Sequence, residues 1–338
     1  MVIIVNKLKQ TIKDMVVVGK GILAADESVK TATKRLASIN VESTEETRRQ
    51  YRNLILTAPK IEKYLSGVIF FEETLYQKSN DGILFPKLLS KRGIVPGIKV
   101  DQGLADFNNS KEQYTKGLDG LGNRLEEYKK VGTRFTKWRA VYSISENTPT
   151  EKIIRKNAED LAKYAKICQQ HDFVPIVEPE VLIDGTHSID ACYNVTEKVL
   201  KAVFDALKKE KVAIDCTILK PSMVISGKQA ENRANVDEVA KKTVKVLKAT
   251  IPDELPSINF LSGGQTPQEA TAHLNRMHTL GEELPWYLSF SYARALQEPA
   301  LNIWQGKEEN VPEAQKEFLK RAELNSLATK GEYSEDME

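Results

Sequence analysis

The sequence has no apolar run long enough to cross a membrane, and it has few cysteines and histidines, the residues that form disulfides and bind zinc. Its 338 residues include only three cysteines and four histidines. Cys168, Cys192 and Cys216 are odd in number and far apart, which is typical of free thiols in a reducing cytoplasm. The histidines are scattered and lack the spacing of a helical zinc pair. We therefore expect a cytoplasmic protein without a metal site.

Two further features are missing. Residues 1–5 are apolar, but they lack the basic flank, the long apolar core and the cleavage site of a signal peptide. There is also no excess of one charge, since 49 basic residues oppose 47 acidic ones. Such a balance gives no general surface for polyanions, and the aromatic residues occur singly rather than as a stacking platform. We expect no nucleic-acid partner and no membrane partner, although local basic groups are able to bind small anions.

What the chain does contain is a regular alternation of apolar runs and amphipathic segments. Eight runs predict β-strands, at residues 21–26, 67–72, 95–101, 134–141, 174–181, 217–224, 258–263 and 286–292. Helix-start patterns lie between them, including capping boxes at residues 148–151 and 266–269, each with a proline at the first helical position. Eight strands separated by helices favour a parallel sheet closed into a (β/α)8 TIM barrel. A doubly wound open sheet is the alternative.

The chain is expected to form one domain. No low-complexity linker divides it, so residues 1–338 are assigned to a single TIM barrel. This length is sufficient for one large α/β domain with a substantial core. The last segment, residues 330–338, is polar and acidic, and we expect it to be a mobile tail.

Polar and charged residues recur at the C-terminal halves of the apolar runs. In a parallel barrel those ends meet at one mouth, where catalytic residues are normally found. The recurring residues are Asp26, Glu72, Lys99, Asp101, Lys137, Arg139, Glu178, Glu180, Lys220, Ser262, Ser291 and Arg294. A layer of mutually neutralising ion pairs would explain one such strand. When all eight runs carry polar or charged residues, burying this many charges is costly unless they perform chemistry or bind a charged ligand.

Lys220 is the most informative of these residues because it interrupts an apolar stretch, Ile-Leu-Lys-Pro at residues 218–221. We place it in the middle of the predicted strand 217–224. Burial, or a neighbouring cation such as Lys137, lowers the pKa of a lysine, and a neutral amine is able to attack a carbonyl group and form a Schiff base. The alternative is a lysine at a strand end that extends to water.

The remaining polar residues indicate the substrate. Several cations at one mouth predict an anionic, phosphorylated ligand. Residues 262–264, Ser-Gly-Gly, are able to present backbone N–H groups to a phosphate after the seventh strand. Asp26, Glu178 and Glu180 supply carboxylates for proton transfer. An imine-forming lysine among carboxylates and phosphate sites indicates formation or cleavage of a carbon–carbon bond in a sugar phosphate.

These residues resemble the class I fructose-bisphosphate aldolases, which use a Schiff base and no metal. The similarity extends from about residue 19 to about residue 297. It is carried by the segments at residues 19–28 (GKGILAADES), 73–77 (ETLYQ), 97–101 (GIKVD), 137–139 (KWR), 177–180 (VEPE), 219–221 (LKP) and 261–265 (LSGGQ). The resemblance implies reversible cleavage of fructose 1,6-bisphosphate into dihydroxyacetone phosphate and glyceraldehyde 3-phosphate, in glycolysis and gluconeogenesis. It also implies a (β/α)8 barrel, no cofactor and a homotetramer.

The resemblance further implies a role for each candidate residue. Lys220 matches the Schiff-base lysine. Glu180 and Lys137 match residues that assist carbinolamine and imine formation, and Glu178 matches a general acid/base. Asp26 matches the carboxylate that takes the C4 hydroxyl proton as the C3–C4 bond breaks. The phosphate sites are matched by Ser262, Gly263 and Arg294 for the C1-phosphate, by Ser28 and Lys99 with Arg139 and Arg35 nearby for the C6-phosphate, and by Ser291 as a further candidate.

Two departures from the family pattern affect the phosphate sites. Ala293 stands where a glycine contributes its backbone to the C1-phosphate site, so we expect the loop to shift to accommodate a Cβ. Residues 29–31, Val-Lys-Thr, replace Thr-Gly-Ser near the C6-phosphate. Thr31 keeps a hydroxyl and Lys30 adds a cation, which leaves open a preference for another ketose bisphosphate or a monophosphate. A binding protein that keeps the barrel and docks a protein filament is a further alternative, which the complete acid–base set disfavours.

Overall fold

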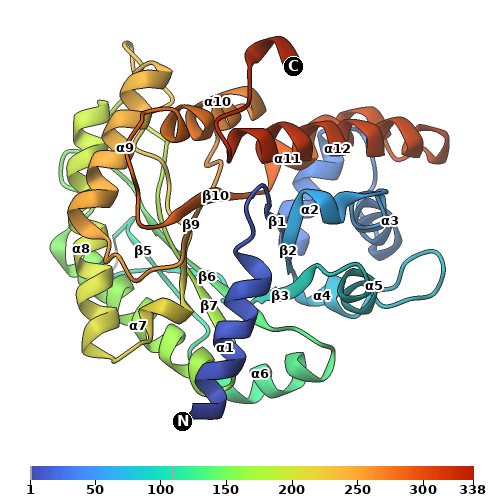
Figure 1. Cartoon of the computed structure of the whole chain (residues 1–338), viewed down its shortest axis with the longest axis horizontal. Coiled ribbons are helices and arrows are strands. Elements are labelled where there is room, and N and C mark those ends of the chain that lie inside the picture. Colours follow the sequence, from blue (N-terminus) through green and yellow to red (C-terminus); the bar gives the residue numbers. More distant parts are fainter. Residues whose placement is uncertain (1, 109) are drawn as a thin grey trace.

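A closed barrel of eight parallel strands forms the centre of the computed structural model, which describes residues 2–108 and 110–338, with side chains from residue 6 onward (Figure 1). The barrel strands are β1 (Gly21–Ala25), β2 (Leu65–Phe70), β3 (Val95–Lys99), β6 (Phe135–Tyr142), β7 (Val174–Val181), β8 (Ile218–Leu219), β9 (Ser257–Phe260) and β10 (Tyr287–Tyr292). Strands adjacent in this order pair in parallel, and β1 pairs with β10 to close the ring. The predicted TIM barrel is confirmed, and the open sheet is wrong.

Helices connect the strands and surround the barrel (Figure 1). They are α1 (Val2–Met15), α2 (Val29–Ala37), α3 (Glu45–Leu56), α4 (Glu72–Leu75), α5 (Phe85–Lys91), α6 (Leu121–Lys130), α7 (Glu151–Gln170), α8 (Ile189–Lys209), α9 (Val236–Thr250), α10 (Pro267–His278), α11 (Arg294–Trp304) and α12 (Val311–Ala328). Their apolar faces follow the helical period. On α7, for example, Ile154, Ala158 and Leu161 are buried against the barrel. None of the described helices is long and apolar enough to cross a bilayer.

Capping residues explain where several helices begin. The predicted capping box of α10 is confirmed, because the Thr266 and Glu269 side chains each accept a hydrogen bond from the other residue's backbone N–H. The predicted box of α7 is wrong. The N-cap of α7 is Thr150, so Pro149 precedes the helix instead of opening it. The carboxylate of Glu112 accepts hydrogen bonds from the backbone N–H and the hydroxyl of Thr150, at 2.7 Å each.

A small antiparallel sheet lies between β3 and α6. It consists of β4 (Leu104–Asp106) and β5 (Gln113–Thr115). Leu104 and Asp106 are both exposed, so this hairpin has no buried apolar run and hydrophobic patterning does not predict it. Glu112, just before β5, ties the hairpin to the start of α7.

Apolar side chains fill the N-terminal end of the barrel, and α1 covers it (Figure 1). Leu8, Ile12 and Met15 of α1 pack in one cluster with side chains from the barrel strands, namely Ile22, Ile69, Val95, Phe135, Val174, Ile176 and Ile218. Glycine is required beside the Phe135 ring, because a Cβ at Gly97 would lie 2.3 Å from it. The Ser66 hydroxyl donates to the Met15 carbonyl at 2.6 Å and anchors the end of α1.

The C-terminal segment makes specific contacts. Tyr333 is buried, and a short 3-10 turn follows at Glu335–Met337. Glu338 forms an ion pair with the buried guanidinium of Arg321 on α12, and the Tyr333 hydroxyl donates to Glu338 at 3.0 Å. The mobility of residues 330–338 stays a prediction.

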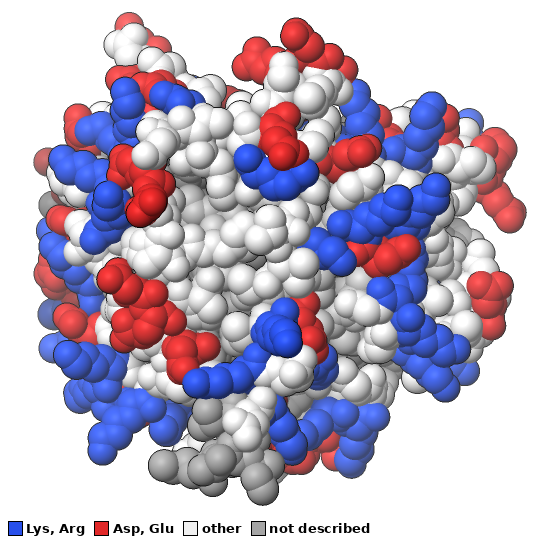
Figure 2. All heavy atoms as spheres, viewed as in Figure 1, with Lys and Arg blue, Asp and Glu red and all other residues white. Residues whose placement is uncertain are grey.

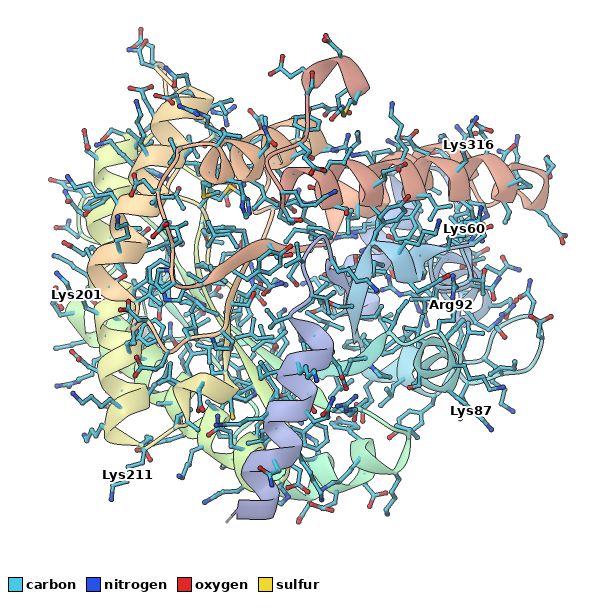
Figure 3. All side chains as sticks on the ribbon, viewed as in Figure 1. Lys60, Lys87, Arg92, Lys201, Lys211 and Lys316 are labelled. Atoms are coloured by element: carbon cyan, nitrogen blue, oxygen red, sulfur yellow. The ribbon has the colours of Figure 1, made fainter. Side chains whose placement is uncertain are left out.

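Charged residues of both signs are interspersed on the face seen in Figure 2, consistent with the nearly balanced composition. The basic side chains labelled in Figure 3, among them Lys60, Arg92 and Lys201, lie at the periphery, on helices and the segments that join them. The three cysteines are free and buried, as expected for packing residues. A buried lysine therefore stands out against the ordinary distribution of charge in this chain.

Candidate active site

One cavity of about 600 Å³ at the C-terminal end of the barrel brings all the candidate residues together. Thirteen of its lining residues were assigned a role from the sequence: Asp26, Ser28, Arg35, Lys99, Lys137, Arg139, Glu178, Glu180, Lys220, Ser262, Gly263, Ser291 and Arg294. They come from the ends of the strands and from the loops and helices that follow. The closed parallel barrel places these ends at one mouth, which explains why residues far apart in sequence meet.

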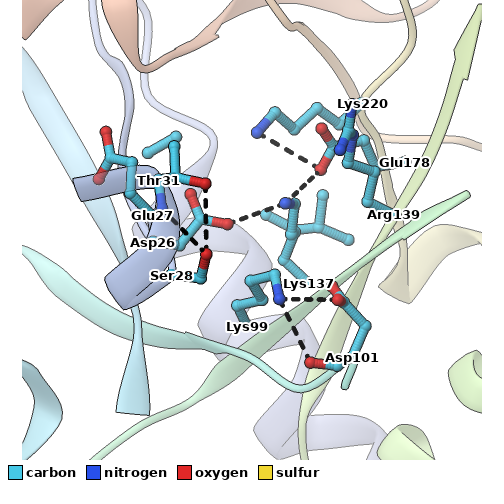
Figure 4. Close-up of polar contacts among 12 residues, drawn as sticks. Asp26, Glu27, Ser28, Thr31, Lys99, Asp101, Lys137, Arg139, Glu178 and Lys220 are labelled. Atoms are coloured by element: carbon cyan, nitrogen blue, oxygen red, sulfur yellow. Dashed lines mark hydrogen bonds and ion pairs between the residues drawn. The ribbon is translucent and has the colours of Figure 1, made fainter. Parts of the chain in front are cut away.

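Lys220 lies immediately after β8 and not in the middle of a strand as predicted. The strand ends at Leu219, because Pro221 has no N–H group to continue the ladder. The Lys220 N–H still donates to the Val177 carbonyl at 2.8 Å. The side chain is only 3% exposed, so the alternative of a lysine that extends to water is wrong. Its Nζ lies 3.5 Å from Oε2 of Glu178 (Figure 4).

A second buried lysine shares this carboxylate. Nζ of Lys137, on β6, lies 2.8 Å from Oδ2 of Asp26 and 2.9 Å from Oε2 of Glu178 (Figure 4). Burial by itself would lower the pKa of Lys137. The adjacent carboxylates of Asp26 and Glu178 outweigh burial and raise this pKa well above its usual range. Lys137 is therefore protonated at neutral pH.

For Lys220 the same influences give the opposite result. Burial lowers its pKa, the Glu178 carboxylate acts in the other direction, and the neighbouring Lys137 cation lowers the pKa further. The net pKa of Lys220 is below the ordinary lysine value of 10.5. The difference has a simple cause, because Lys137 is in contact with two carboxylates and Lys220 with one that is already shared.

Asp26 is ionised at neutral pH. Burial tends to raise its pKa, but Lys137, Lys220 and Lys99 together hold this pKa well below its usual range. The Asp26 side chain is 10% exposed. Among the described residues, Lys137 is its only ion-pair partner. A substrate that displaces Lys137 from this carboxylate would therefore leave a carboxylate able to accept a proton.

The cavity has no excess of positive charge. Six cationic and six carboxylate side chains line it. Most are paired with each other, as in the pairs Arg139–Glu180, Lys99–Asp101 and Arg35–Glu27. Among the described residues, Arg294 has no carboxylate partner. The sequence-based expectation that many cations attract the substrate is thus too simple, and recognition of an anion depends on particular groups with free hydrogen-bond donors.

A glycine turn after β9 supplies such donors. The Gln265 N–H donates to the Ser262 carbonyl at 2.9 Å, and Gly263 and Gly264 between them have φ angles of +48° and +87°. Both lie in the left-handed region that favours glycine, and a Cβ at Gly263 would be 2.7 Å from the Leu261 side chain. Within the part of the chain that the structure describes, the Gly263 N–H donates to no protein acceptor. This N–H is available to a ligand in the cavity.

The start of α11 borders the same cavity. Ala293 is the N-cap, and no side chain caps this helix, so its first N–H groups are available to an anion. The φ angle of Ala293 is −104°, outside the left-handed region, so the backbone at this position does not require glycine. The Ser291 hydroxyl is buried and has no hydrogen-bond partner among the described residues. These groups and the glycine turn form a candidate phosphate site.

The segment that departs from the family pattern lies at the start of α2. The Ser28 side chain caps this helix, accepting from the Thr31 N–H at 3.4 Å, and its hydroxyl lies 3.2 Å from that of Thr31 (Figure 4). Thr31 lines the cavity, whereas Lys30 is exposed and does not. The Thr31 hydroxyl is therefore within reach of a ligand in the cavity, whereas the Lys30 ammonium lies outside it.

Three residues beside Asp26 were missed by sequence reasoning. Glu27 is buried and forms an ion pair with Arg35. It forms a second ion pair with Arg52 on α3, at an N–O distance of 2.7 Å. Gln297 on α11 donates to Glu27 at 3.2 Å and to the carbonyl of Ala24 at 2.6 Å. The position of Glu27 at the end of an apolar run was an available signal. Arg52 and Gln297 lie on helices with ordinary patterns, and nothing in the sequence marks them.

A TIM barrel whose mouth holds a buried lysine of lowered pKa beside carboxylates defines an enzyme that forms an imine with a carbonyl substrate. Comparison with known proteins identifies the family. The family described as Fructose-bisphosphate aldolase class-I matches residues 7–338, and the chain belongs to it. It is an enzyme of glycolysis and gluconeogenesis that reversibly cleaves fructose 1,6-bisphosphate into two triose phosphates through a lysine Schiff base, as the resemblance implies.

Relatives from distant organisms match over nearly the whole chain. A probable fructose-bisphosphate aldolase class 1 of Xanthomonas campestris is 51% identical over 331 residues, which are 97% of this chain and 99% of the relative. The cytosolic fructose-bisphosphate aldolase 6 of Arabidopsis thaliana is 52% identical over 319 residues, 94% and 89% of the two chains. The Plasmodium falciparum aldolase, solved with TRAP and a small-molecule inhibitor, has a TM-score of 0.96 and 48% identity, covering 98% of this chain and 96% of that one.

Proposed function

We propose that Lys220 is the residue that forms the Schiff base, and that Lys137 is the cation that assists it. The observation that supports this assignment is the difference in pKa between the two buried lysines, which both contact the carboxylate of Glu178. The pKa of Lys220 is lowered, so its amine is the one more readily deprotonated, whereas the pKa of Lys137 is raised and its amine stays protonated. Only a neutral amine attacks the C2 carbonyl of the ketose.

Glu178 and Glu180 are proposed to move the protons of imine formation. Attack by Lys220 on C2 gives a carbinolamine, and loss of its hydroxyl as water requires a proton. Glu178 is the nearest acid, with Oε2 3.5 Å from Nζ of Lys220, and it is also in contact with the Lys137 ammonium. Glu180 lines the same cavity and is paired with Arg139, so it would exchange protons only after the substrate loosens this ion pair.

Asp26 is proposed to take the C4 hydroxyl proton. The positively charged imine accepts the electron pair of the C3–C4 bond, and the C4 hydroxyl becomes the aldehyde of glyceraldehyde 3-phosphate as it loses its proton. The resulting enamine is then protonated at C3 and hydrolysed, which releases dihydroxyacetone phosphate and restores Lys220. The ionised state of Asp26 and its position 2.8 Å from Lys137 support this role.

The two phosphates are proposed to bind on different elements. The turn at Ser262 and Gly263, the start of α11 with Arg294, and the unpartnered Ser291 hydroxyl support a C1-phosphate site. For the C6-phosphate, the candidates are the N-terminus of α2 at Ser28 and the side chains of Lys99, Arg139 and Arg35. Each of the three cations is paired with a carboxylate, so we infer that the C6-phosphate competes with these pairs when it binds.

Borohydride trapping tests the assignment of Lys220 directly. The enzyme is incubated with dihydroxyacetone phosphate, reduced, digested and mapped by mass spectrometry. We expect one triose adduct per chain, located on Lys220. A label on Lys137, on Lys99 or on no lysine would overturn the assignment. Activity should be unaffected by EDTA, in keeping with the expected absence of a metal.

Residues 29–31 raise the question of a second substrate. Thr31 keeps a hydroxyl in the cavity lining while Lys30 does not line it, which supports retained use of the bisphosphate. We expect kcat/KM for fructose 1,6-bisphosphate to exceed that for fructose 1-phosphate by at least about tenfold, because the monophosphate leaves one site without a ligand. Equal values would favour the monophosphate as an alternative substrate.

We also propose that the chain works in the cytoplasm as a homotetramer of single-domain subunits. Two Arabidopsis relatives at 50% and 52% identity are named as cytosolic, and the family resemblance supports the tetramer. Light scattering after gel filtration should give about four times the protomer mass of 38.0 kDa. A single dominant monomer peak at working concentration would contradict the tetramer.

A further inference from the structure

Behind the glycine turn, His273 of α10 contacts the side chain that closes the turn. His273 is 4% exposed and does not line the active-site cavity. Its Nδ1 lies 2.6 Å from Oε1 of Gln265. Gln265 is 5% exposed, and its Nε2 donates to the Ser262 carbonyl at 3.0 Å. A buried chain of hydrogen bonds therefore links α10 to the turn that carries Ser262 and Gly263.

The direction of each hydrogen bond in this chain is fixed by chemistry. The Ser262 carbonyl is only an acceptor, so the Gln265 atom that faces it must be the amide nitrogen. The Gln265 oxygen then faces His273, and Nδ1 of the ring must carry the proton and donate it. A neutral imidazole has one such N–H, and burial lowers the pKa of His273 to about 4, so the ring is neutral under physiological conditions.

The other polar groups near the ring have their own partners. Glu269 belongs to the capping box of α10 and forms an ion pair with Arg233 at 3.0 Å. Neither is hydrogen-bonded to His273. The imidazole is therefore directed at Gln265 alone among these groups.

This contact acts at a part of the chain that needs support. Two consecutive glycines have the largest backbone freedom of any dipeptide, and ordering them costs more conformational entropy than ordering other residues. The Ser262 carbonyl accepts from both the backbone N–H and the side chain of Gln265, at 2.9 and 3.0 Å. The second of these bonds exists only while the Gln265 amide is held in one orientation.

We propose that His273 is a positioning residue for the aldolase reaction. By donating Nδ1–H to Gln265, it fixes the amide orientation that closes the turn at residues 262–265 and holds the Ser262 hydroxyl and the Gly263 N–H ready for the substrate phosphate. The inference rests on the proposed role of this turn in phosphate binding. Losing the donor would leave the Gln265 oxygen buried without a partner, so the amide would turn away and release Ser262.

Two substitutions of His273 distinguish the loss of its Nδ1–H donor from a general change in side-chain size and polarity. His273→Asn would place an amide N–H where Nδ1 lies, whereas His273→Gln would place it near the position of Nε2; both replacements are neutral and polar. We expect His273→Asn to stay within about twofold of wild type, and His273→Gln to raise KM for fructose 1,6-bisphosphate about tenfold while kcat changes less than twofold. His273→Leu, which removes the donor, should match His273→Gln.

Coupling to Gln265 gives a second readout. If His273 acts through Gln265, the double variant His273→Leu/Gln265→Leu should have the same KM as Gln265→Leu alone. Additive effects would overturn the proposal, as would equal KM values for the His273→Asn and His273→Gln variants. Should the leucine variants fail to fold, as judged by circular dichroism, the comparison of His273→Asn with His273→Gln decides the question.

Ser262→Ala distinguishes this inference from the proposed function. If Ser262→Ala leaves KM unchanged, the Ser262 hydroxyl does not bind the phosphate and the proposed function fails at that residue. If Ser262→Ala raises KM but His273→Gln does not, the phosphate site stands and only the positioning role of His273 is wrong.

Discussion

At its N-terminal end the barrel is packed with apolar side chains under α1, whereas at its C-terminal end charged side chains line a cavity of about 600 Å³. The same strands build both ends. On β6, Phe135 belongs to the apolar cluster and Lys137, two residues further on, belongs to the cavity. Residues two apart point to the same side of a strand. The change from packing to chemistry therefore takes place within one or two residues along the barrel interior.

This comparison separates two kinds of free energy. Burying apolar surface at the lower end stabilises the fold. Burying charges at the upper end is costly, and the cost is offset only where each charge has a partner, as Lys137 has and Lys220 has only in part. Mutations at the lower end should therefore alter stability and leave the chemistry intact. Mutations of the charged residues at the C-terminal end should reduce turnover and leave stability intact, unless they leave a buried partner of opposite charge unpaired.

The largest effect is expected for Lys220→Met. Turnover should fall on the order of 10⁵-fold or more, because no other amine replaces the nucleophile. Stability should not fall. The folded pKa of Lys220 is below 10.5, so the charged side chain opposes folding at every pH below that folded pKa, and methionine removes this penalty. Steady-state assays and urea unfolding measure both, with the exposed Lys201→Met as control. Retained turnover would contradict the assignment.

Lys137→Met should combine the two effects. It removes the cation that lies between Asp26 and Glu178 and leaves two buried carboxylates without it. We expect a loss of roughly 3–5 kcal/mol in the free energy of unfolding, in addition to a loss of turnover. The sign follows from the raised pKa of Lys137, whose stabilisation is fully present below pH 10.5. A variant as stable as Lys220→Met would show that the two lysines are equivalent.

Phe135→Ala tests the lower end. The ring fills the space against Gly97, so its removal should leave a cavity and reduce the free energy of unfolding by about 3 kcal/mol. Below the unfolding transition, kcat should stay within about twofold of wild type. Urea denaturation with activity measured on the same samples checks this. A large fall in kcat without unfolding would show that the two ends are coupled.

The two lysines should also differ in reactivity when nothing is mutated. They are similarly buried, at 3% and 4% exposure, so access does not distinguish them. Reductive methylation modifies only the neutral amine, so at pH 8 Lys220 should be labelled at least about tenfold faster than Lys137. Mass spectrometry of timed digests gives both rates. The midpoint of labelling for Lys220 should lie below 10.5, and a midpoint above that value would contradict the lowered pKa.

The smallest effect is expected for Ala293→Gly. The φ angle of Ala293 is −104°, outside the left-handed region that favours glycine, so glycine relieves no left-handed strain and mainly increases the freedom of the unfolded chain. KM for fructose 1,6-bisphosphate should change by less than about twofold, and the free energy of unfolding should fall by up to about 1 kcal/mol. A large decrease in KM would show that the Cβ of Ala293 impedes phosphate binding.

Most of the barrel could be predicted because its signal is local. Each strand has its own apolar run, and the polar residue at the end of that run marks the mouth, as Asp26 and Glu178 do. The short β8 was overestimated because the apolar run continues past Pro221, where the ladder cannot. The β4–β5 hairpin lacks the apolar run on which strand prediction depends.

The pairing inside the cavity could not be predicted in the same way. Which cation contacts Glu178 depends on strand register, such as the pairing of Arg139 with Glu178 across β6 and β7, and register is not encoded in any single run. The resemblance supplied expected roles for residues but not the sharing of one carboxylate by Lys137 and Lys220. The contact between His273 and Gln265 joins a helix to a turn, and neither residue has a sequence pattern that points to the other.

In the described part of the chain, the apolar packing under α1 closes the N-terminal end of the barrel and leaves a single opening. With the lower barrel filled by side chains, the substrate enters and both products leave by the same mouth. If Lys220 forms the Schiff base as proposed, the ketose half is attached to it when the carbon chain is cut, so the aldehyde half is the only piece free to depart. Glyceraldehyde 3-phosphate must therefore exit first, and in the synthetic direction dihydroxyacetone phosphate must be loaded before its partner arrives.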